Sequence, residues 1–174
     1  RKSKMSAQTR YGYSTPKGHA GGIYDLAPYA IDTFINEADT GVMKFGIGVV
    51  QGENVGHGIN VPKKGATAAK FEGVTTNNRS TEYDLVGNLS VRKGAAVGVM
   101  RYGRIYARIA DKAEPKPGEA VYLILDGDEA GYFTNVAAPE SPDAPTIAIK
   151  ARFLGGVDTS AKVAVIELFN QAQA

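Results

Sequence analysis

The chain has 174 residues, of which 43% are apolar, so it is long enough and apolar enough to bury a hydrophobic core. Its 20 Lys and Arg residues nearly balance 18 Asp and Glu residues, so the net charge gives no support for nucleic-acid binding. Cysteine is absent, which excludes disulfides and thiolate metal sites, and no apolar run approaches the roughly 18 residues of a membrane-spanning helix.

The first 20 residues differ in charge from the rest of the chain. They carry five bases and no acid, whereas the remainder has 15 bases against 18 acids. We therefore predict a basic extended arm over residues 1–20, followed by one β-rich domain over residues 21–174. The arm is either a solvated, poorly ordered terminus or a segment that orders on an acidic neighbour. The second interpretation gives these candidate partner-binding residues: Arg1, Lys2, Lys4, Arg10, Tyr11 and Tyr13.

Glycine then recurs at short intervals between β-branched and aromatic runs, a pattern typical of short strands joined by tight turns. Residues 24–39 are ambiguous because Ile31, Phe34 and Ile35 have helical spacing while Pro28 interrupts any helix, so we expect a turn or short helix leading into a strand. Proline marks residues 111–118 and 138–145 as surface loops. Strands are predicted over residues 44–51, 69–74, 81–86, 89–91, 96–100, 104–109, 120–125, 132–136, 146–154 and 164–169.

Two segments share the order turn, strand, turn, strand, and both start at a glycine. Gly94 and Gly118 would supply the first turn of each unit, and Gly103 and either Gly127 or Gly131 the second. A single hairpin is only marginally stable, so two such units are expected to pack together. The sequence therefore predicts an all-β fold, either a β-sandwich, a jelly-roll-like sandwich or a small barrel.

No catalytic constellation is recognisable in the sequence. His19 and His57 both lie among glycines, where exposed turn residues are the usual occupants. Gly46 and Gly48 lack the third glycine of a dinucleotide fingerprint, and Ser90 lacks the flanking glycines of a nucleophile elbow. We therefore expect no enzyme activity, no cofactor and no metal site.

Acidic residues offer two weaker alternatives to this expectation. Residues 126–131 space their carboxylates like the first half of a calcium loop, but the twelfth position is Ala137 instead of a bidentate glutamate. A polar hairpin turn is the better interpretation, and a surface ion stays an alternative. Glu82 and Asp84 would share one face of a strand, where a solvated face is expected and a carboxylate pair of a hydrolase is the alternative.

A mixed aromatic and basic face is predicted on the strand that follows Gly103. Alternation places Tyr102, Arg104, Tyr106 and Arg108 on one side of the chain. Such a face suits either a stacking platform for single-stranded nucleic acid or a half-solvated strand face. We favour the solvated face, and expect no direct nucleic-acid role, because no further basic strand is visible beside it.

Several blocks of sequence resemble head cement proteins of tailed phages. They include GGIYDLAPY at 21–29, KFGIGVV at 44–50, VRKGAAVGVMRYGRIY at 91–106, GEAVYL at 118–123 and ARFLGGV at 151–157. The resemblance extends from about residue 21 to residue 169 and leaves the arm outside.

This resemblance implies a capsid decoration subunit that self-associates as a dimer or trimer and binds the lattice of major capsid proteins on the outer surface of a phage head. It transfers no active-site residues. A protein that binds the assembled lattice but not its dissociated subunits stabilises the lattice by mass action, and many copies multiply modest contacts. Another virion module, such as a tail component or a host-glycan-binding adhesin, is the alternative.

Overall fold

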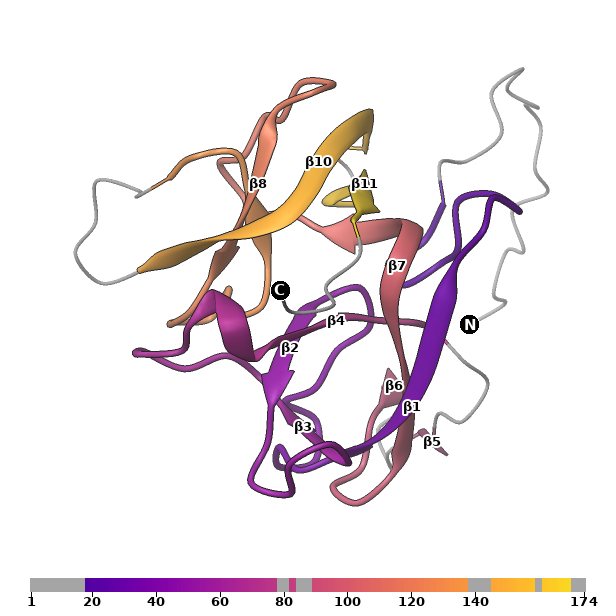
Figure 1. Ribbon diagram of the computed structural model, residues 1–174, viewed down its shortest axis with the longest axis vertical. Helices are drawn as coiled ribbons and strands as arrows, with labels where there is room; N and C mark the ends of the chain where they lie inside the picture. The colour runs from indigo at the N-terminus through magenta and orange to yellow at the C-terminus, as the bar shows by residue number, and fades with distance from the viewer. Residues whose placement is uncertain (1–17, 78–81, 84–88, 138–144, 159–160, 170–174) are drawn as a thin grey trace, which may run out of the picture.

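The computed structural model describes residues 18–77, 82–83, 89–137, 145–158 and 161–169 (Figure 1). These ranges contain strands and one 3₁₀ helix but no α-helix, which confirms the predicted all-β fold. The elements are β1 (Ala30–Asn36), β2 (Gly48–Gln51), β3 (Gly58–Asn60), η1 (Ala68–Lys70), β4 (Phe71–Thr75), β5 (Glu82–Tyr83), β6 (Leu89–Ser90), β7 (Ala96–Arg108), β8 (Ala120–Ile124), β9 (Phe133–Thr134), β10 (Thr146–Asp158) and β11 (Val163–Leu168).

One sheet contains all of these strands except β5 and β6, which pair with each other. Its order is β1-β3-β2-β4-β7-β11-β10-β8-β9, and β1 pairs a second time, with β7. The second pairing is antiparallel, with Phe34 opposite Val97, and it closes β1, β3, β2, β4 and β7 into a ring. Of the architectures predicted from sequence, the small barrel is the one that describes this closed ring.

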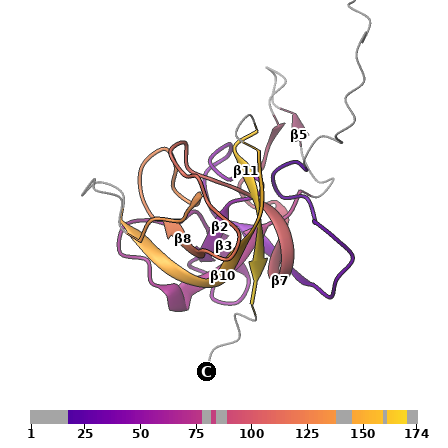
Figure 2. The same cartoon turned by 90° about the horizontal axis from the view of Figure 1, so that it is seen from above.

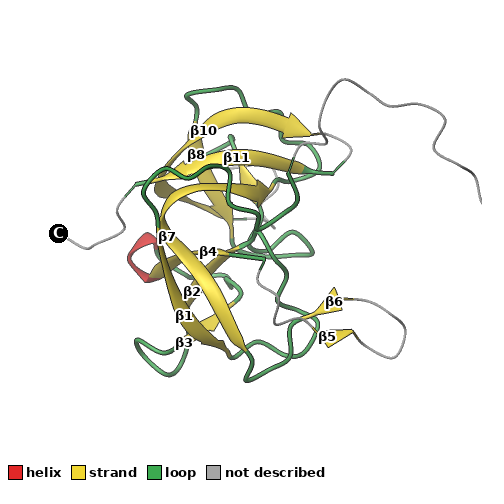
Figure 3. Cartoon of the chain, turned by 90° about the vertical axis from the view of Figure 1, so that its right-hand side faces the viewer, coloured by secondary structure: helices red, strands yellow, loops and turns green. Residues whose placement is uncertain are grey.

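The sheet continues beyond the ring through the second half of β7. Ile105 of β7 lies opposite Ile166 of β11, and β11 lies between β7 and β10 (Figure 2). Figure 3 shows β8, β10 and β11 on one side of the molecule and β1 to β4 on the other, with β7 running from one to the other. β9, the last strand in the sheet order, lies beside the end of β7. There the Ala110 N–H donates to the Phe133 carbonyl at 3.0 Å.

Inward-pointing residues of the strands form two hydrophobic clusters, one inside the ring and one that joins the second half of the sheet to Phe71 and Val74 of β4. Val97 and Val99 belong to the cluster inside the ring, whereas Ile105 and Ala107, farther along β7, belong to the other. The ring cluster also contains Phe34, Met43, Ile47, Val49 and Ile59. The largest side chains of the second cluster include Met100, Leu123, Phe133, Phe153, Ile166 and Leu168.

Gly103 bends a continuous strand, so the prediction of two strands separated by a turn at this residue is wrong. β7 runs through Gly103 without interruption, and the residue has φ of +122°, which side chains other than glycine rarely adopt. A Cβ built on Gly103 would lie 2.6 Å from the Cβ of Tyr29. The glycine therefore lets β7 pass close to Tyr29 while it bends from one half of the sheet to the other. The turns predicted at Gly94 and Gly118 are confirmed, with φ of +81° and +90°.

Other boundaries also differ from the predictions. The ambiguous stretch forms strand β1 over Ala30–Asn36, with no helix, because it pairs with β3 and β7 at once. The short β3 was not predicted, β2 begins at Gly48 instead of residue 44, and β10 continues to Asp158 instead of residue 154. Only Glu82 and Tyr83 of the strand predicted over residues 81–86 lie in the described ranges.

Two polar side chains at the end of β1 fix the loops at that end of the ring. The buried Asn36 amide donates to the Arg92 carbonyl at 3.0 Å, which holds the turn before β7. The Glu37 carboxylate accepts hydrogen bonds from the backbone N–H groups of Glu53 and Asn54 and from the Asn54 side chain. These bonds, the backbone bond from Asn54 above all, lower the pKa of Glu37. The charged carboxylate therefore holds the loop between β2 and β3.

Candidate partner-binding surface

Six of the ten large apolar side chains that are exposed in the described ranges lie on the segment before β1 or on residues near it in the fold. Four lie on the segment that precedes β1, one lies on β7, and one follows β11. Leu26, at the tip of the segment, is 96% exposed. We call this region the Leu26 patch, and its members are Ile23, Tyr24, Leu26, Tyr29, Tyr102 and Phe169.

Backbone hydrogen bonds hold the N-terminal part of this segment against β7. The Gly21 N–H donates to the Tyr106 carbonyl at 2.8 Å, and the Tyr106 N–H donates back to the Gly22 carbonyl at 2.9 Å. The Tyr24 N–H donates to the Arg104 carbonyl at 3.0 Å. These bonds extend the sheet by one short pairing, so the segment that carries Leu26 is anchored at its start by main-chain contacts.

A network of two arginines and two carboxylates lies beside the patch. Arg104 donates from Nη1 to Oδ2 of Asp25 at 2.8 Å and from Nε to Oε1 of Glu167 at 3.0 Å. Arg152 donates to the second oxygen of Glu167 at 2.6 Å. The Asp25 carboxylate also accepts from the Ala27 N–H at 3.1 Å. Two positive and two negative charges therefore neutralise one another and fix the loop at Asp25.

The pKa values within this network shift as close opposite charges require. The hydrogen bond from Arg104 is the main cause that lowers the pKa of Asp25. Burial raises the pKa of Glu167, but the hydrogen bonds from Arg104 and Arg152 outweigh burial, so its pKa lies below the ordinary value. The hydrogen bonds with Asp25 and Glu167 raise the pKa of Arg104. Asp25, Glu167 and Arg104 are therefore charged at neutral pH.

A hollow of about 290 Å³ lies between the Leu26 segment and the end of β11. Pro28, Tyr102 and Phe169 line it together with the paired arginines. The Arg152 guanidinium lies 5.8 Å from the centre of the Phe169 ring, within the range of a cation–π contact. Tyrosine and arginine are among the residue types that dominate binding energy at protein interfaces, and phenylalanine is enriched there. The surface is therefore suited to contact with another protein.

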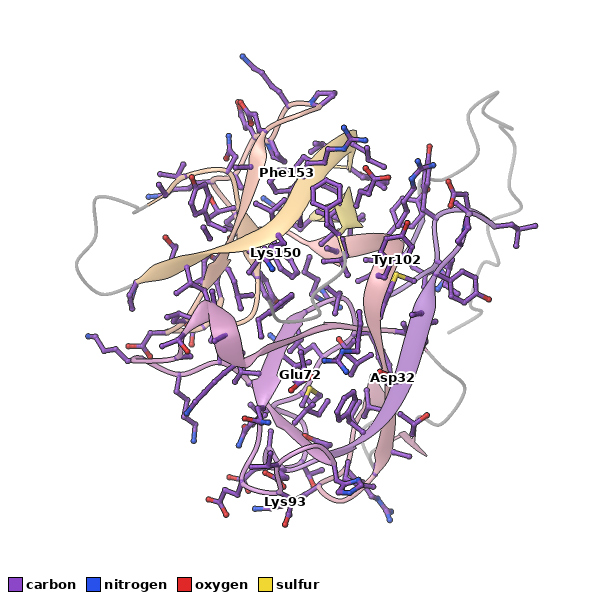
Figure 4. All side chains as sticks on the ribbon, viewed as in Figure 1. Asp32, Glu72, Lys93, Tyr102, Lys150 and Phe153 are labelled. Carbon is purple, nitrogen blue, oxygen red and sulfur yellow. The ribbon has the colours of Figure 1, made fainter. Side chains whose placement is uncertain are left out.

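The predicted mixed face of β7 exists, and its arginines are engaged within the protein. Residues 103, 105 and 107 are buried, whereas Tyr102 (labelled in Figure 4), Arg104, Tyr106 and Arg108 are at least partly exposed on the other face. Arg108 donates to the Phe45 carbonyl at 2.9 Å. Tyr106 packs edge to face with Tyr24 at 5.6 Å. The face is thus the half-solvated one that the sequence favoured, and Tyr102 is part of the Leu26 patch.

The candidate binding residues predicted from sequence lie outside the described ranges. They are Arg1, Lys2, Lys4, Arg10, Tyr11 and Tyr13. The described chain starts at Gly18, which packs so closely against the Tyr106 ring that a Cβ there would overlap it. Because Tyr106 contacts Tyr24, the first described residue lies next to the Leu26 patch.

The structure describes some of the histidines and acidic residues that were considered as weaker chemical alternatives. His19 and His57 are exposed, and His57 lies in a turn, as predicted. In the turn at residues 126–131, the Glu129 carboxylate accepts from the Asp111 N–H at 2.7 Å. Asp84 and the side chains of Glu82 and Ser90 lie outside what the structure describes.

In the described ranges, no three His, Asp or Glu side chains come together as a metal site would need. The same ranges contain no helix with the length and apolar character that a bilayer crossing requires.

Residues 7–169 match the phage family described as structural cement protein (E217 gp24/Pam3 gp6). The chain belongs to this family of phage cement proteins. The match confirms the resemblance seen in the sequence and begins inside the arm, which the resemblance left outside. No curated protein matches the cement protein in sequence.

A solved structure with the same fold comes from a phage head. It is a chain of "The capsid of Myoviridae Phage XM1", with 19% sequence identity and a TM-score of 0.68. The alignment covers 94% of this chain and 98% of that one. At this identity the likeness shows the fold, and the family match gives the role. The cement protein is a structural component of a phage capsid, as the resemblance implied, and not the tail or adhesin module that was the alternative.

Proposed function

We propose that this cement protein binds the major capsid protein directly, on the outer surface of the head, and acts through that contact without catalysing a reaction. The observation that carries the proposal is the Leu26 patch, an exposed apolar surface on a segment anchored to β7 and beside a neutralised ion-pair network. Burial of such a surface is favourable, and anchoring it in advance lowers the entropy lost on binding. A capsid offers many copies of the site, so the contacts add up over the lattice.

The arm is proposed as a second part of the same contact. It carries the candidate residues Arg10, Tyr11 and Tyr13, and the first described residue, Gly18, lies next to the Leu26 patch. Patch and arm can therefore reach one neighbouring subunit. Each exposed ion pair adds at most about 1 kcal/mol and is screened by salt, so the two tyrosines should contribute more affinity than any one base.

We also propose that the cement protein self-associates as a dimer or trimer, as the resemblance to decoration subunits implies. Apolar residues outside the patch, at Ile35 and Val42, provide exposed surface for such a contact. Sedimentation at micromolar concentration tests the proposal. A species of dimer or trimer mass is expected, and a monomer throughout would contradict it.

Heads that lack the cement protein test its capsid contact. Such heads should rupture or lose their genome at a lower temperature than complete heads, and adding the purified protein should restore the difference. Deleting residues 1–15 should leave the body folded and weaken binding, with part of the deficit surviving at high salt because packed tyrosines are not screened. Equal stability of heads with and without the protein would contradict the proposed function. If the truncated protein occupied heads fully across a salt series, only the proposed role of the arm would be contradicted.

A further inference from the structure

A basic segment projects from the ring between β3 and β4. From Asn54 to Phe71 the chain has no Asp or Glu, and it carries Lys63, Lys64 and Lys70, all exposed. No residue of η1 is buried, so η1 itself contributes little to the hydrophobic core. Figure 1 shows it in magenta on the side of the molecule away from β1 and from the segment before it. The basic surface is therefore separate from the Leu26 patch.

The three lysines border a groove of about 330 Å³ against β2 and β3. Gln51 and Asn60 are among the lining residues, as are the buried Val50 and Val61. Ammonium groups only donate hydrogen bonds, and amide groups donate as well as accept. The groove therefore presents mainly hydrogen-bond donors and positive charge.

Few acids of the protein neutralise this groove. Glu53 is the one acid among its lining residues. Lys64 lies 4.0 Å from Asp126, and these side chains are 64% and 46% exposed, so that pair is weak. Within the described ranges, neither Lys63 nor Lys70 forms an ion pair. In the Leu26 network, by contrast, every charge has a partner inside the protein.

We propose that this groove holds a carboxylate-rich segment of a neighbouring capsid subunit, a contact that rests on the proposed binding to the capsid. Charge complementarity carries the proposal, because three clustered ammonium groups with one lining acid attract carboxylates and disfavour basic or neutral partners. Carboxylates are favoured over single-stranded nucleic acid because no aromatic side chain and no arginine lines the groove, so it offers no surface on which bases would stack.

The groove and the Leu26 patch lie on different sides of the molecule, so one copy can contact two parts of the lattice through two kinds of interaction. The patch contact is apolar and insensitive to salt. The groove contact is electrostatic, so it should weaken steeply as the salt concentration rises.

A charge-matched pair of variants tests the groove. Lys63→Gln, Lys64→Gln and Lys70→Gln are combined in one protein, and Lys112→Gln, Lys116→Gln and Lys150→Gln in a control that loses the same charge elsewhere. All six lysines are exposed, so both variants should fold, as thermal unfolding will show. Binding to heads that lack the cement protein is measured from about 0.05 M to about 0.5 M salt. The groove variant should bind roughly tenfold more weakly at the lowest salt and like the wild type at the highest, while the control stays close to the wild type throughout.

Three results would overturn the proposal, and they have different meanings. Equal losses of binding in the two variants would show a general charge effect. They would contradict the groove contact and leave the proposed function standing. Retention of the wild type on immobilised duplex DNA through these three lysines, with head binding unchanged by their substitution, would assign the groove to nucleic acid. Failure of the wild-type protein to bind heads at any salt concentration would contradict both the proposed function and the groove contact.

Discussion

Replacing Gly103 by alanine places a methyl group where β7 bends past Tyr29. At φ of +122° an alanine costs about 1 to 2 kcal/mol relative to glycine. The new Cβ would lie 2.6 Å from the Tyr29 Cβ, so strand or side chain must move, which adds about 1 to 3 kcal/mol of overpacking. We expect Gly103→Ala to lower the free energy of unfolding by about 2 to 5 kcal/mol, measured as a shift of the urea midpoint at unchanged slope.

Gly118→Ala is the matched control for this substitution. Gly118 also has a positive φ, of +90°, but no atom lies within 4 Å of the position its Cβ would take. Its substitution should therefore cost only the backbone term, about 1 to 2 kcal/mol. If the two alanine variants lost the same stability within about 0.5 kcal/mol, the close approach of β7 and Tyr29 would not contribute, and the reasoning about the bend would be refuted.

Two further predictions concern the end of β1. Asn36→Ala leaves the buried partner groups of its amide without a hydrogen bond. The free energy of unfolding, measured by urea denaturation, should therefore fall by about 2 to 3 kcal/mol. A change below about 0.5 kcal/mol would contradict this role of Asn36. Glu37 has a lowered pKa, so its charged form contributes stability above the ordinary pKa of a glutamate, and this is lost as the pH falls below about 4. Glu37→Gln should therefore be less stable than the wild type at pH 7 and lose less stability on acidification; parallel pH curves for the two proteins would contradict the assignment.

The class of fold could be predicted because its signals are local. Glycines at regular intervals mark turns, as Gly94 and Gly118 confirm, and β-branched runs between them mark strands. Gly103 was misassigned because a turn and a bend both need the conformational freedom of glycine, and only pairing partners far along the chain distinguish them. β1 was ambiguous for the same reason, since its pairing with β7 overrides the helical spacing of Ile31, Phe34 and Ile35.

The candidate surface was harder to predict than the fold. Charge counting along the chain was enough to single out the basic arm, because net charge does not depend on folding. The exposure of Leu26 does depend on it, and a leucine in a sequence is more often buried than exposed. The available signal was local: Asp25 and Pro28 flank Leu26, and the run from Gly21 to Tyr29 has neither helical nor strand periodicity.

The substitution Leu26→Ser most directly tests whether the anchored apolar patch forms the capsid contact. Leu26 is almost fully exposed, so its loss should not change folding, whereas a leucine buried on binding contributes about 1.5 to 3 kcal/mol, roughly ten- to a hundredfold in Kd. Val55→Ser removes an exposed apolar side chain on another loop and serves as the control. We predict that Leu26→Ser binds heads lacking the cement protein at least tenfold more weakly and fails to restore their thermal stability, while Val55→Ser matches the wild type. Full occupancy and full protection of heads by the Leu26→Ser protein would contradict the proposed contact.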